Sequence, residues 1–391
     1  MEVLIQFEKK PLLFKDAEFI ISCTNPALFK STFGDIESAL SQGYYLAGFL
    51  AYEAGYYFEE KLFQDRQYDF PLIYLGAYKH FTRDTLGGAD PGYRLANLRL
   101  NLSQEQYSLN IGAIRDYIAK GDVYQITYCL KLLFEFYGEP LSLYYQLLKE
   151  QPVPYPAYIQ TPEFQILSLS PELFLKKKGS HLVTKPMKGT WPRGNSVFAD
   201  LIAPWCLKYD RKNRAENVMI ADLLRNDLGR LGANIKAPTL FEVARYKTLC
   251  QMTSTVTAKV KPEFSIYELF AAVFPSGSVT GAPKIRAMEI MQGLEQDQRK
   301  IYTGAIGYIT PDKDMFFNIP IRTLLVYGKG PVSSSSQARL TARQARLAAR
   351  QAEMGIGGGI VWDSTPLGEW NEGLLKAKFL TDLSEAHFSP A

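Results

Sequence analysis

Residues 185–194, Lys-Pro-Met-Lys-Gly-Thr-Trp-Pro-Arg-Gly, restrict the possible folds of the chain more than its other motifs do. Pro186 and Pro192 lack the N–H donor that a helix interior needs, so this segment is not helical. It is typical of a strand end that runs into a fixed turn, where Gly189 lets the backbone approach a neighbour closely. Lys188 on such a turn can be a nucleophile, an anion-binding group or a solvated charge, and the segment alone leaves these three roles open.

Composition favours an ordinary globular protein. The 391 residues are 47% hydrophobic, enough for one large domain or two. The four cysteines lie far apart without a Cys-x-x-Cys pair, and the three histidines are scattered, so we expect neither a zinc site nor a disulfide framework. The first ten residues carry charges where a signal peptide is apolar, and no stretch is long enough to span a membrane. These features predict a cytoplasmic protein.

The net charge of +4 has a local origin. Residues 330–350 contain no acid, and their arginines account for the whole surplus: Arg339, Arg343, Arg346 and Arg350. The charge therefore gives no general argument for nucleic-acid binding. Because this stretch differs in composition from its surroundings, we expect an exposed insertion, which a fold tolerates at little entropic cost.

Residues 210–229 form the clearest predicted helix. Glu216 and Asp227 share a face with its apolar stripe. A carboxylate in such a position is costly unless it is paired, protonated or bound to metal. The helix alone leaves open whether Glu216 pairs with Arg214 or Arg225, or binds a metal ion.

Other segments show clear periodicity. Aromatic and apolar residues in the first 80 positions predict strands, and Glu172 is expected just past a strand end. The remaining predictions are helices at 103–120 and 141–150, strands at 123–134, 164–169 and 173–175, and two antiparallel strands within 301–328 that carry Tyr302 and Arg322.

Residues 274–294 place glycines and hydroxyl side chains directly before a predicted helix, with Pro283 near its first turn. Free N–H groups at such a helix start favour a carboxylate or phosphate, although a plain capped helix is the alternative.

A second glycine-rich stretch, residues 355–364, predicts a strand that leads towards a helix. Glu369, Glu372 and Lys376 are spaced i, i+3 and i+7 on that helix, so they share a face. They form either a solvated face or, with the glycine-lined strand, a pocket for a small charged ligand.

Together these stretches resemble the chorismate-utilising enzyme family, and within it the aminodeoxychorismate synthase branch. The matching segments follow the family order from about residue 105 to the C-terminus: 170–172, 186–190 with 192–194, 214–217 with 222–227, 277–284, 302–304 with 307–308, 321–323, and 357–364 with Glu369 and Glu372. The resemblance implies an α+β fold, with two stacked antiparallel β-sheets, helices outside and the site in a cleft. We expect one domain over residues 1–391, with the motif-bearing core at 105–384.

The resemblance also implies roles. Glu172 would be the general acid, and Lys188 would attack the ring to form a covalent adduct that ammonia then displaces. The pKa of a free lysine is about 10.4, so we expect burial, magnesium and Arg193 to lower the pKa of Lys188 by about three units. Magnesium would be held by Glu216, Glu372 and Glu369. The implied substrate-binding residues are Gln125, Thr190, Gly281, Tyr302, Arg322, Gly357, Gly358, Gly359 and Lys376.

Two positions distinguish branches of the family. Anthranilate synthases typically have alanine where this chain has Lys188, and isochorismate synthases have a lysine where it has Gln125. Both residues favour amination of chorismate. No cysteine lies in a glycine-flanked nucleophile turn, so a separate glutaminase partner is expected to deliver ammonia.

Three departures from the family pattern accompany this assignment. Gln251 replaces a frequent histidine, and residues 1–100 lack the motif of a tryptophan pocket. The insertion at 330–350, between the Arg322 strand and the glycine-lined strand, is not usual in the family. The alternatives are an anthranilate synthase component and an inactive chorismate-binding subunit.

Overall fold

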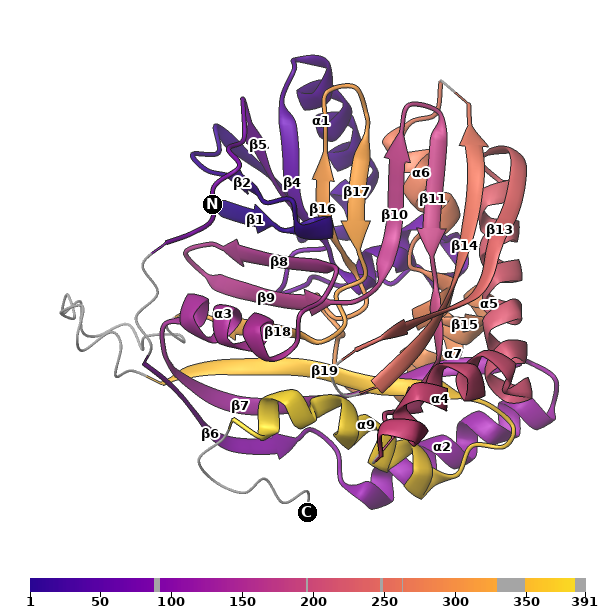
Figure 1. The fold of residues 1–391 in the computed structure, drawn as a ribbon. Helices are drawn as coiled ribbons and strands as arrows, with labels where there is room; N and C mark the ends of the chain where they lie inside the picture. The colour runs from indigo at the N-terminus through magenta and orange to yellow at the C-terminus, as the bar shows by residue number, and fades with distance from the viewer. Residues whose placement is uncertain (88–91, 195, 247–248, 262, 329–348, 384–391) are drawn as a thin grey trace.

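A computed structural model describes residues 1–87, 92–194, 196–246, 249–261, 263–328 and 349–383. Within these residues the chain forms one nine-stranded and one ten-stranded antiparallel sheet. Figure 1 shows the strands of one sheet crossing those of the other, with helices on the outside. The expected α+β fold of two stacked antiparallel sheets is confirmed. The arginine-rich insertion expected at 330–350 lies outside the described residues, apart from its last two positions.

The nine-stranded sheet contains the long ladder between β7 and β19. In order across the sheet, its strands are β15 (Gly281–Ala282), β7 (Gln125–Gly138), β19 (Arg350–Ile360), β18 (Thr323–Tyr327), β9 (Phe164–Ser170), β8 (Tyr155–Gln160), β1 (Glu2–Ile5) and β2 (Leu12–Phe14), with β6 (Tyr93–Leu100) also paired to β7. The predicted glycine-lined strand is β19, and it pairs with β7 along its whole length, from Arg350 opposite Phe136 to Ile360 opposite Ile126.

The ten-stranded sheet carries the Lys188 strand near one edge. Its order is β12 (Met187–Pro192), β14 (Leu249–Val260), β11 (His181–Lys185), β10 (Leu173–Lys178), β17 (Met315–Asn318), β16 (Ala305–Ile309), β4 (Tyr45–Leu50), β5 (Ile73–Tyr78) and β3 (Phe19–Cys23), with β13 (Gly232–Arg245) also paired to β14. The segment around Lys188 is therefore a strand, as its prolines and glycine predict.

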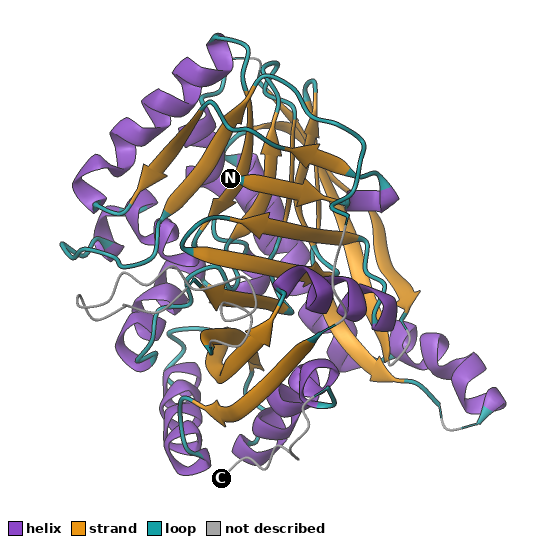
Figure 2. Ribbon diagram, turned by 90° about the vertical axis from the view of Figure 1, so that its left-hand side faces the viewer, coloured by secondary structure: helices purple, strands orange, loops and turns teal. Residues whose placement is uncertain are grey.

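The helices lie at the periphery of both sheets, as the two views in Figures 1 and 2 show. They are α1 (Phe29–Ser41), α2 (Gln104–Ala119), α3 (Pro140–Glu150), α4 (Val197–Tyr209), α5 (Arg211–Gly229), α6 (Ile266–Val273), α7 (Lys284–Leu294) and α9 (Pro366–Thr381). The periodic helices α2, α3 and α5 begin and end within two residues of their predicted bounds. None of the helices within the described ranges is both long and apolar enough to cross a membrane.

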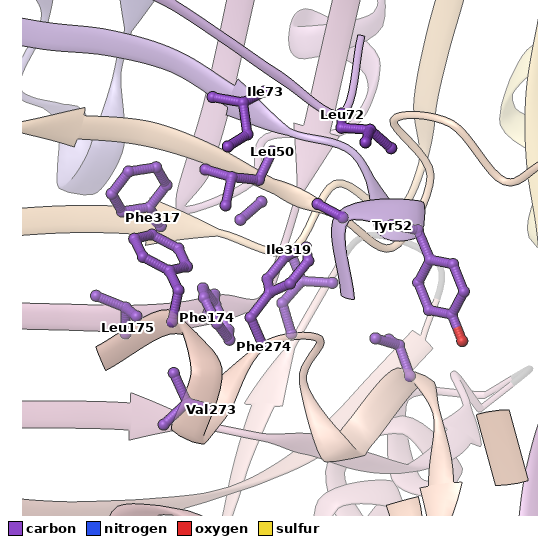
Figure 3. Close-up of a cluster of buried hydrophobic side chains, with 14 of the residues drawn as sticks. Leu50, Tyr52, Leu72, Ile73, Phe174, Leu175, Val273, Phe274, Phe317 and Ile319 are labelled. Carbon is purple, nitrogen blue, oxygen red and sulfur yellow. The ribbon is translucent and has the colours of Figure 1, made fainter. Parts of the chain in front are cut away.

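Aromatic packing fixes α6 against the ten-stranded sheet. Phe274, which follows α6, meets Phe174 of β10 edge to face at a centroid distance of 5.8 Å, and Phe270 meets Phe317 of β17 at 5.5 Å. Figure 3 shows Phe174, Phe274 and Phe317 in one buried cluster with Leu50 and Ile73. Because this cluster holds β10 in place, it also fixes the turn before β10, which carries Glu172.

Two predicted segments differ from the structure. Residues 301–328 form three strands, because β16 and β17 make a hairpin in one sheet while β18 pairs with β9 in the other. In 274–294 the glycines do not lead directly into the helix, since the turn Gly277–Val279 and the strand β15 come first. Strand β15 pairs with β7, which separates the start of α7 from the glycine turn.

Candidate active site

A cavity of about 330 Å³ lies where β12 and α5 approach β19 and α9. It is lined by all the predicted site residues except Gln125 and Gly281. Gly281 lies in β15, where an added Cβ would come within 2.3 Å of the carbonyl oxygen of Gln125, so it serves close packing of two strands. The side chain of Gln125 is fully buried behind Gly359.

Lys188 reaches this cavity from β12. The backbone turns at Gly189, whose φ of +102° is strained for any other residue. Asn217 of α5 donates a 3.0 Å hydrogen bond to the carbonyl oxygen of Lys188 and so fixes the strand to the helix. Burial is the main cause that lowers the pKa of Lys188, and the charge of Lys376 lowers it further, whereas Glu216 and Glu172 oppose the shift. The lysine is therefore closer to its neutral, nucleophilic form than a solvated lysine is.

Arg193 does not supply the positive charge that we expected beside Lys188. It forms an ion pair with Asp200 of α4, and its guanidinium also donates to the carbonyl oxygen of Tyr246 at 2.7 Å. Because Asp200 balances the charge of Arg193, the expected lowering of the Lys188 pKa comes from burial and from Lys376.

Glu172 occupies the turn between β9 and β10 and is only 3% exposed. Its Oε1 accepts hydrogen bonds from the Ser278 hydroxyl at 2.7 Å and from the Met187 N–H at 3.1 Å. Burial raises the pKa of Glu172 to about 7, although both hydrogen bonds and the charge of Lys188 act in the opposite direction. A carboxyl group with this pKa can both donate and accept a proton near neutral pH.

Three carboxylates line the cavity, Glu216 from α5 and Glu369 and Glu372 from α9. An added Cβ at Gly358 would lie 3.1 Å from Oε2 of Glu369 and 3.6 Å from Oε1 of Glu372, so both carboxylates face this glycine. Burial raises the pKa of Glu369 and of Glu216, and in each case the charge of Glu372 adds to the rise. Pairing with Lys376 instead lowers the pKa of Glu372, and a further cation would offset the effect of Glu372 on the other two carboxylates.

The three carboxylates resemble a magnesium site more than a complete set of protein ligands. No group of three or more His, Cys, Asp or Glu side chains in the described part of the chain forms a ready set of ligands. Magnesium, however, commonly takes one or two carboxylates and completes its shell with water and substrate oxygens. Three carboxylate side chains that line one cavity, two of them with a pKa raised by burial and by the charge of Glu372, fit such an ion.

Arg214 and Arg225, the two ion-pair partners considered for Glu216 from the sequence, have other contacts in the structure. Arg225 pairs with Asp222 at 2.9 Å, and Arg214 lies 4.4 Å above the ring of Phe241. At the far end of the helix, Asp227 pairs with Lys284 at 2.5 Å. These contacts leave the carboxylate of Glu216 facing the cavity.

Two cationic side chains also line the cavity. Lys376 donates to the carbonyl oxygen of Gly357 at 2.7 Å and pairs with Glu372 at 2.8 Å. Arg322 is largely buried, which lowers its pKa, and it contacts Oε1 of Gln151 at 3.3 Å. Tyr302 lies against Gly355, where an added Cβ would come within 2.1 Å of its ring. The cavity therefore offers positive charge, an aromatic ring and bare backbone to an anionic ligand.

Sequence reasoning assigned no role to several residues that contribute to the site. Ser278 is the hydroxyl partner of Glu172, and Thr127, Lys212 and Asn213 line the cavity. Ser278 lies within a glycine-rich motif that we assigned to a helix start, and only its contact with Glu172 reveals its position. Thr127 lies two residues after Gln125 on a predicted strand, and this alternation is the sequence signal that could have found it.

The fold is known from solved structures of other proteins. Anthranilate synthase component I from Streptococcus pneumoniae superposes with a TM-score of 0.73 at 22% sequence identity, covering 97% of this chain and 89% of that one. A structure reported as a 2,3-dihydroxybenzoate-specific isochorismate synthase from Bacillus anthracis gives a TM-score of 0.77 at 16% identity, covering 97% and 95%. At these identities the likeness establishes the fold.

The sequence establishes the family. Residues 87–382 match the family model described as chorismate binding enzyme, and the chain belongs to that family. Aminodeoxychorismate synthase component 1 of Bacillus subtilis is 35% identical over 277 residues, which are 70% of this chain and 54% of that protein. Anthranilate synthase component 1 of Lactococcus lactis is 32% identical over 291 residues, 74% of this chain and 59% of that protein. The matched region thus spans little more than half the length of these relatives.

Proposed function

We propose that the chain is the synthase component that converts chorismate and ammonia to 4-amino-4-deoxychorismate, the precursor of para-aminobenzoate. The observation that carries this proposal is the buried amine of Lys188 in the same cavity as Glu172, whose pKa is raised to about 7. Relatives named aminodeoxychorismate synthase component 1 support the same reaction.

The cavity suits a substrate with two carboxylates. Arg322 and Lys376 would bind these groups, together with the backbone around Gly357. Glu216, Glu369 and Glu372 would hold magnesium, which when bound would withdraw electrons from the ring and neutralise charge that develops there.

The side chains of the protein can perform the remaining steps. Protonated Glu172 gives its proton to the ring hydroxyl, which leaves as water with the electron pair of the C–O bond. The neutral Nζ of Lys188 forms a bond to the ring and then returns one proton to the carboxylate of Glu172. The chain thereby becomes a secondary amine adduct, and Glu172 is again protonated.

Ammonia completes the reaction. Its nitrogen bonds to the ring, the electron pair of the bond to Lys188 returns to Nζ, and one ammonia proton passes to the departing lysine. The products are the amino compound and free Lys188. The ammonia would come from a separate glutaminase component, as the term component 1 in the names of the relatives suggests.

The test is to incubate the protein with chorismate, Mg²⁺ and ammonium, and to identify the product with and without an added lyase. We expect an amino compound that yields para-aminobenzoate only with the lyase. Anthranilate formed directly would favour the second candidate, anthranilate synthase, which the relative from Lactococcus lactis represents.

The role of Lys188 has its own test. Lys188→Ala should lower the amination rate by about 10³-fold or more, and intact-protein mass spectrometry should no longer detect an adduct after incubation with chorismate alone. Lys185→Ala is the matched control, because Lys185 lies three residues away and pairs loosely with Glu242 at 3.8 Å. Full amination by Lys188→Ala would overturn the covalent mechanism.

A further inference from the structure

Helix α4 exposes apolar side chains to solvent along its whole length. Six large hydrophobic residues of this helix are between 38% and 90% exposed: Val197, Phe198, Leu201, Ile202, Trp205 and Tyr209. No other helix or strand of the described residues exposes more than two such side chains. The helix lies at the periphery of the molecule in Figure 1, and Figure 2 shows it projecting at the right-hand edge.

The six residues form one continuous face, which we call the α4 stripe. Phe198, Ile202, Trp205 and Tyr209 follow each other at steps of three or four residues, so they lie one above the other on the helix. Leu201 precedes Trp205 by four residues and widens the same face. The exposed apolar residues are therefore a single surface rather than scattered side chains.

The inner face of α4 is apolar as well. Ala203 and Leu207 pack with Cys250 and Met252 of β14 in a small buried core. A helix that is apolar on all sides is normally buried in a larger core or crosses a membrane. A membrane span needs about 20 residues, whereas α4 has 13. We therefore expect another surface to cover its outer face.

The α4 stripe is large for the surface of a single chain. Because an aromatic side chain covers about 150–250 Å², the exposed parts of the six residues amount to roughly 600–700 Å². The largest apolar patch of a monomeric protein is about 300–600 Å², and a stable interface takes about 800 Å² from each partner. The stripe thus exceeds a usual patch and supplies most of one side of an interface.

Charge distinguishes among the surfaces that could cover the stripe. The charged residues of α4 are Asp200 and Lys208, and Asp200 is paired with Arg193. A helix that lies on a lipid surface normally has a polar face rich in Lys and Arg. α4 has a single lysine, and the face opposite the stripe packs on β14 instead of facing water. These features argue against a lipid surface.

Composition favours a second copy of the chain. Interfaces between different soluble proteins are about as polar as the rest of the surface, whereas homodimer interfaces are more apolar. No residue of the α4 stripe is charged, so two copies of the stripe can meet without repulsion. One helix face is also self-complementary, because a two-fold axis through it pairs the helix with its own copy.

We propose that two copies of this chain associate through α4, with the α4 stripe of one copy packed antiparallel against that of the other around a two-fold axis. The inference does not depend on the proposed function. Since α4 also packs against β12, the association would restrain the strand that carries Lys188.

The first test compares association of wild type and charge variants. Sedimentation velocity over about a hundredfold range of protein concentration should show wild type changing from a 44.1 kDa monomer to a dimer, and its Tm should rise with concentration. Leu201→Glu places a charge in the stripe and should leave only monomer, with a Tm that does not depend on concentration. Leu109→Glu is the matched control, because Leu109 is an exposed leucine on α2, outside the stripe.

A milder variant keeps the surface uncharged. Phe198→Ala removes one exposed ring from the stripe, and we expect the dissociation constant of the dimer to rise about tenfold or more. The Tm of this variant at low concentration should equal that of wild-type monomer, since the ring contacts solvent there.

Cys206 gives an independent measurement. It is exposed, whereas Cys23, Cys129 and Cys250 are buried, so a nitroxide label attaches to Cys206 alone. Paired helices lie about 8–10 Å apart, and the two labels of a dimer should therefore lie within about 30 Å of each other. Pulsed electron spin resonance measures this distance, and Cys206→Ala is the blank.

Three results would overturn the proposal. The first is a wild type that stays monomeric at every concentration. The second is a dimer that Leu201→Glu leaves intact or whose labels lie well beyond the expected distance, because another face would then form the contact. The third is a monomer whose tryptophan fluorescence shifts to the blue with vesicles of phosphatidylglycerol and loses this shift in Trp205→Phe, which would assign the stripe to a lipid surface.

Discussion

The hydroxyl of Ser278 donates a 2.7 Å hydrogen bond to Oε1 of Glu172, which joins a glycine-rich turn to the carboxyl group proposed as the general acid. This bond stabilises the charged form of Glu172 and limits the rise in its pKa that burial causes. The serine therefore adjusts the pH at which the acid loses its proton.

The first prediction concerns the pH dependence of kcat. The protonated form of Glu172 donates to the leaving hydroxyl, so the rate should fall as pH rises through about 7. Ser278→Ala removes an interaction that lowers the pKa, and the alkaline limb should move to higher pH. Ser276→Ala is the control, because Ser276 contacts Ser278 at 3.0 Å but has no contact with Glu172. The prediction fails if the limb of Ser278→Ala coincides with that of wild type.

A second prediction concerns magnesium. Glu216→Gln removes one of the three carboxylates that line the cavity, and Mg²⁺ affinity measured by calorimetry in the presence of chorismate should fall at least about tenfold. Glu289→Gln provides a matched change at a partly exposed ion pair with Arg286, outside the cavity. Equal Mg²⁺ affinity in wild type and Glu216→Gln would exclude Glu216 as a ligand.

A third prediction concerns the glycine-lined strand β19. A methyl group at Gly359 would lie 2.5 Å from Gln125, so Gly359→Ala should displace that side chain, lower amination and destabilise the protein by about 1–3 kcal/mol. Gly293→Ala in α7 has no atom within 4 Å and should instead stabilise the fold by about 0.5–1 kcal/mol. Thermal unfolding and activity assays distinguish the two variants. Wild-type activity in Gly359→Ala would show that the strand tolerates a side chain there.

Local periodicity explains which parts of the fold could be predicted. The helix α5 and the spacing of Glu369, Glu372 and Lys376 follow from the 3.6-residue repeat, and the strand at Lys188 follows from its prolines. These features depend on neighbours in the sequence. The family resemblance then supplied the topology, which periodicity alone does not determine.

Contacts between distant segments could not be predicted in this way. Arg193 was expected to act on Lys188, but Asp200 on α4 pairs with it, and nothing in the sequence marks that partner. Ser278 and Glu172 are 106 positions apart and come from different elements. Strand β18 follows a hairpin in one sheet yet joins the other, because its partner β9 lies there.

The first strands of the chain determine which part of the sequence can fold as one unit. The family model begins at residue 87, but β4 pairs with β16 in the ten-stranded sheet and β1 pairs with β8 in the nine-stranded sheet. Both partners lie inside the matched region. A fragment that starts at residue 87 would therefore leave β16 and β8 without these partners. Unpaired strand edges of this kind promote aggregation. The stretch by which the protein is recognised is smaller than the stretch that must fold together.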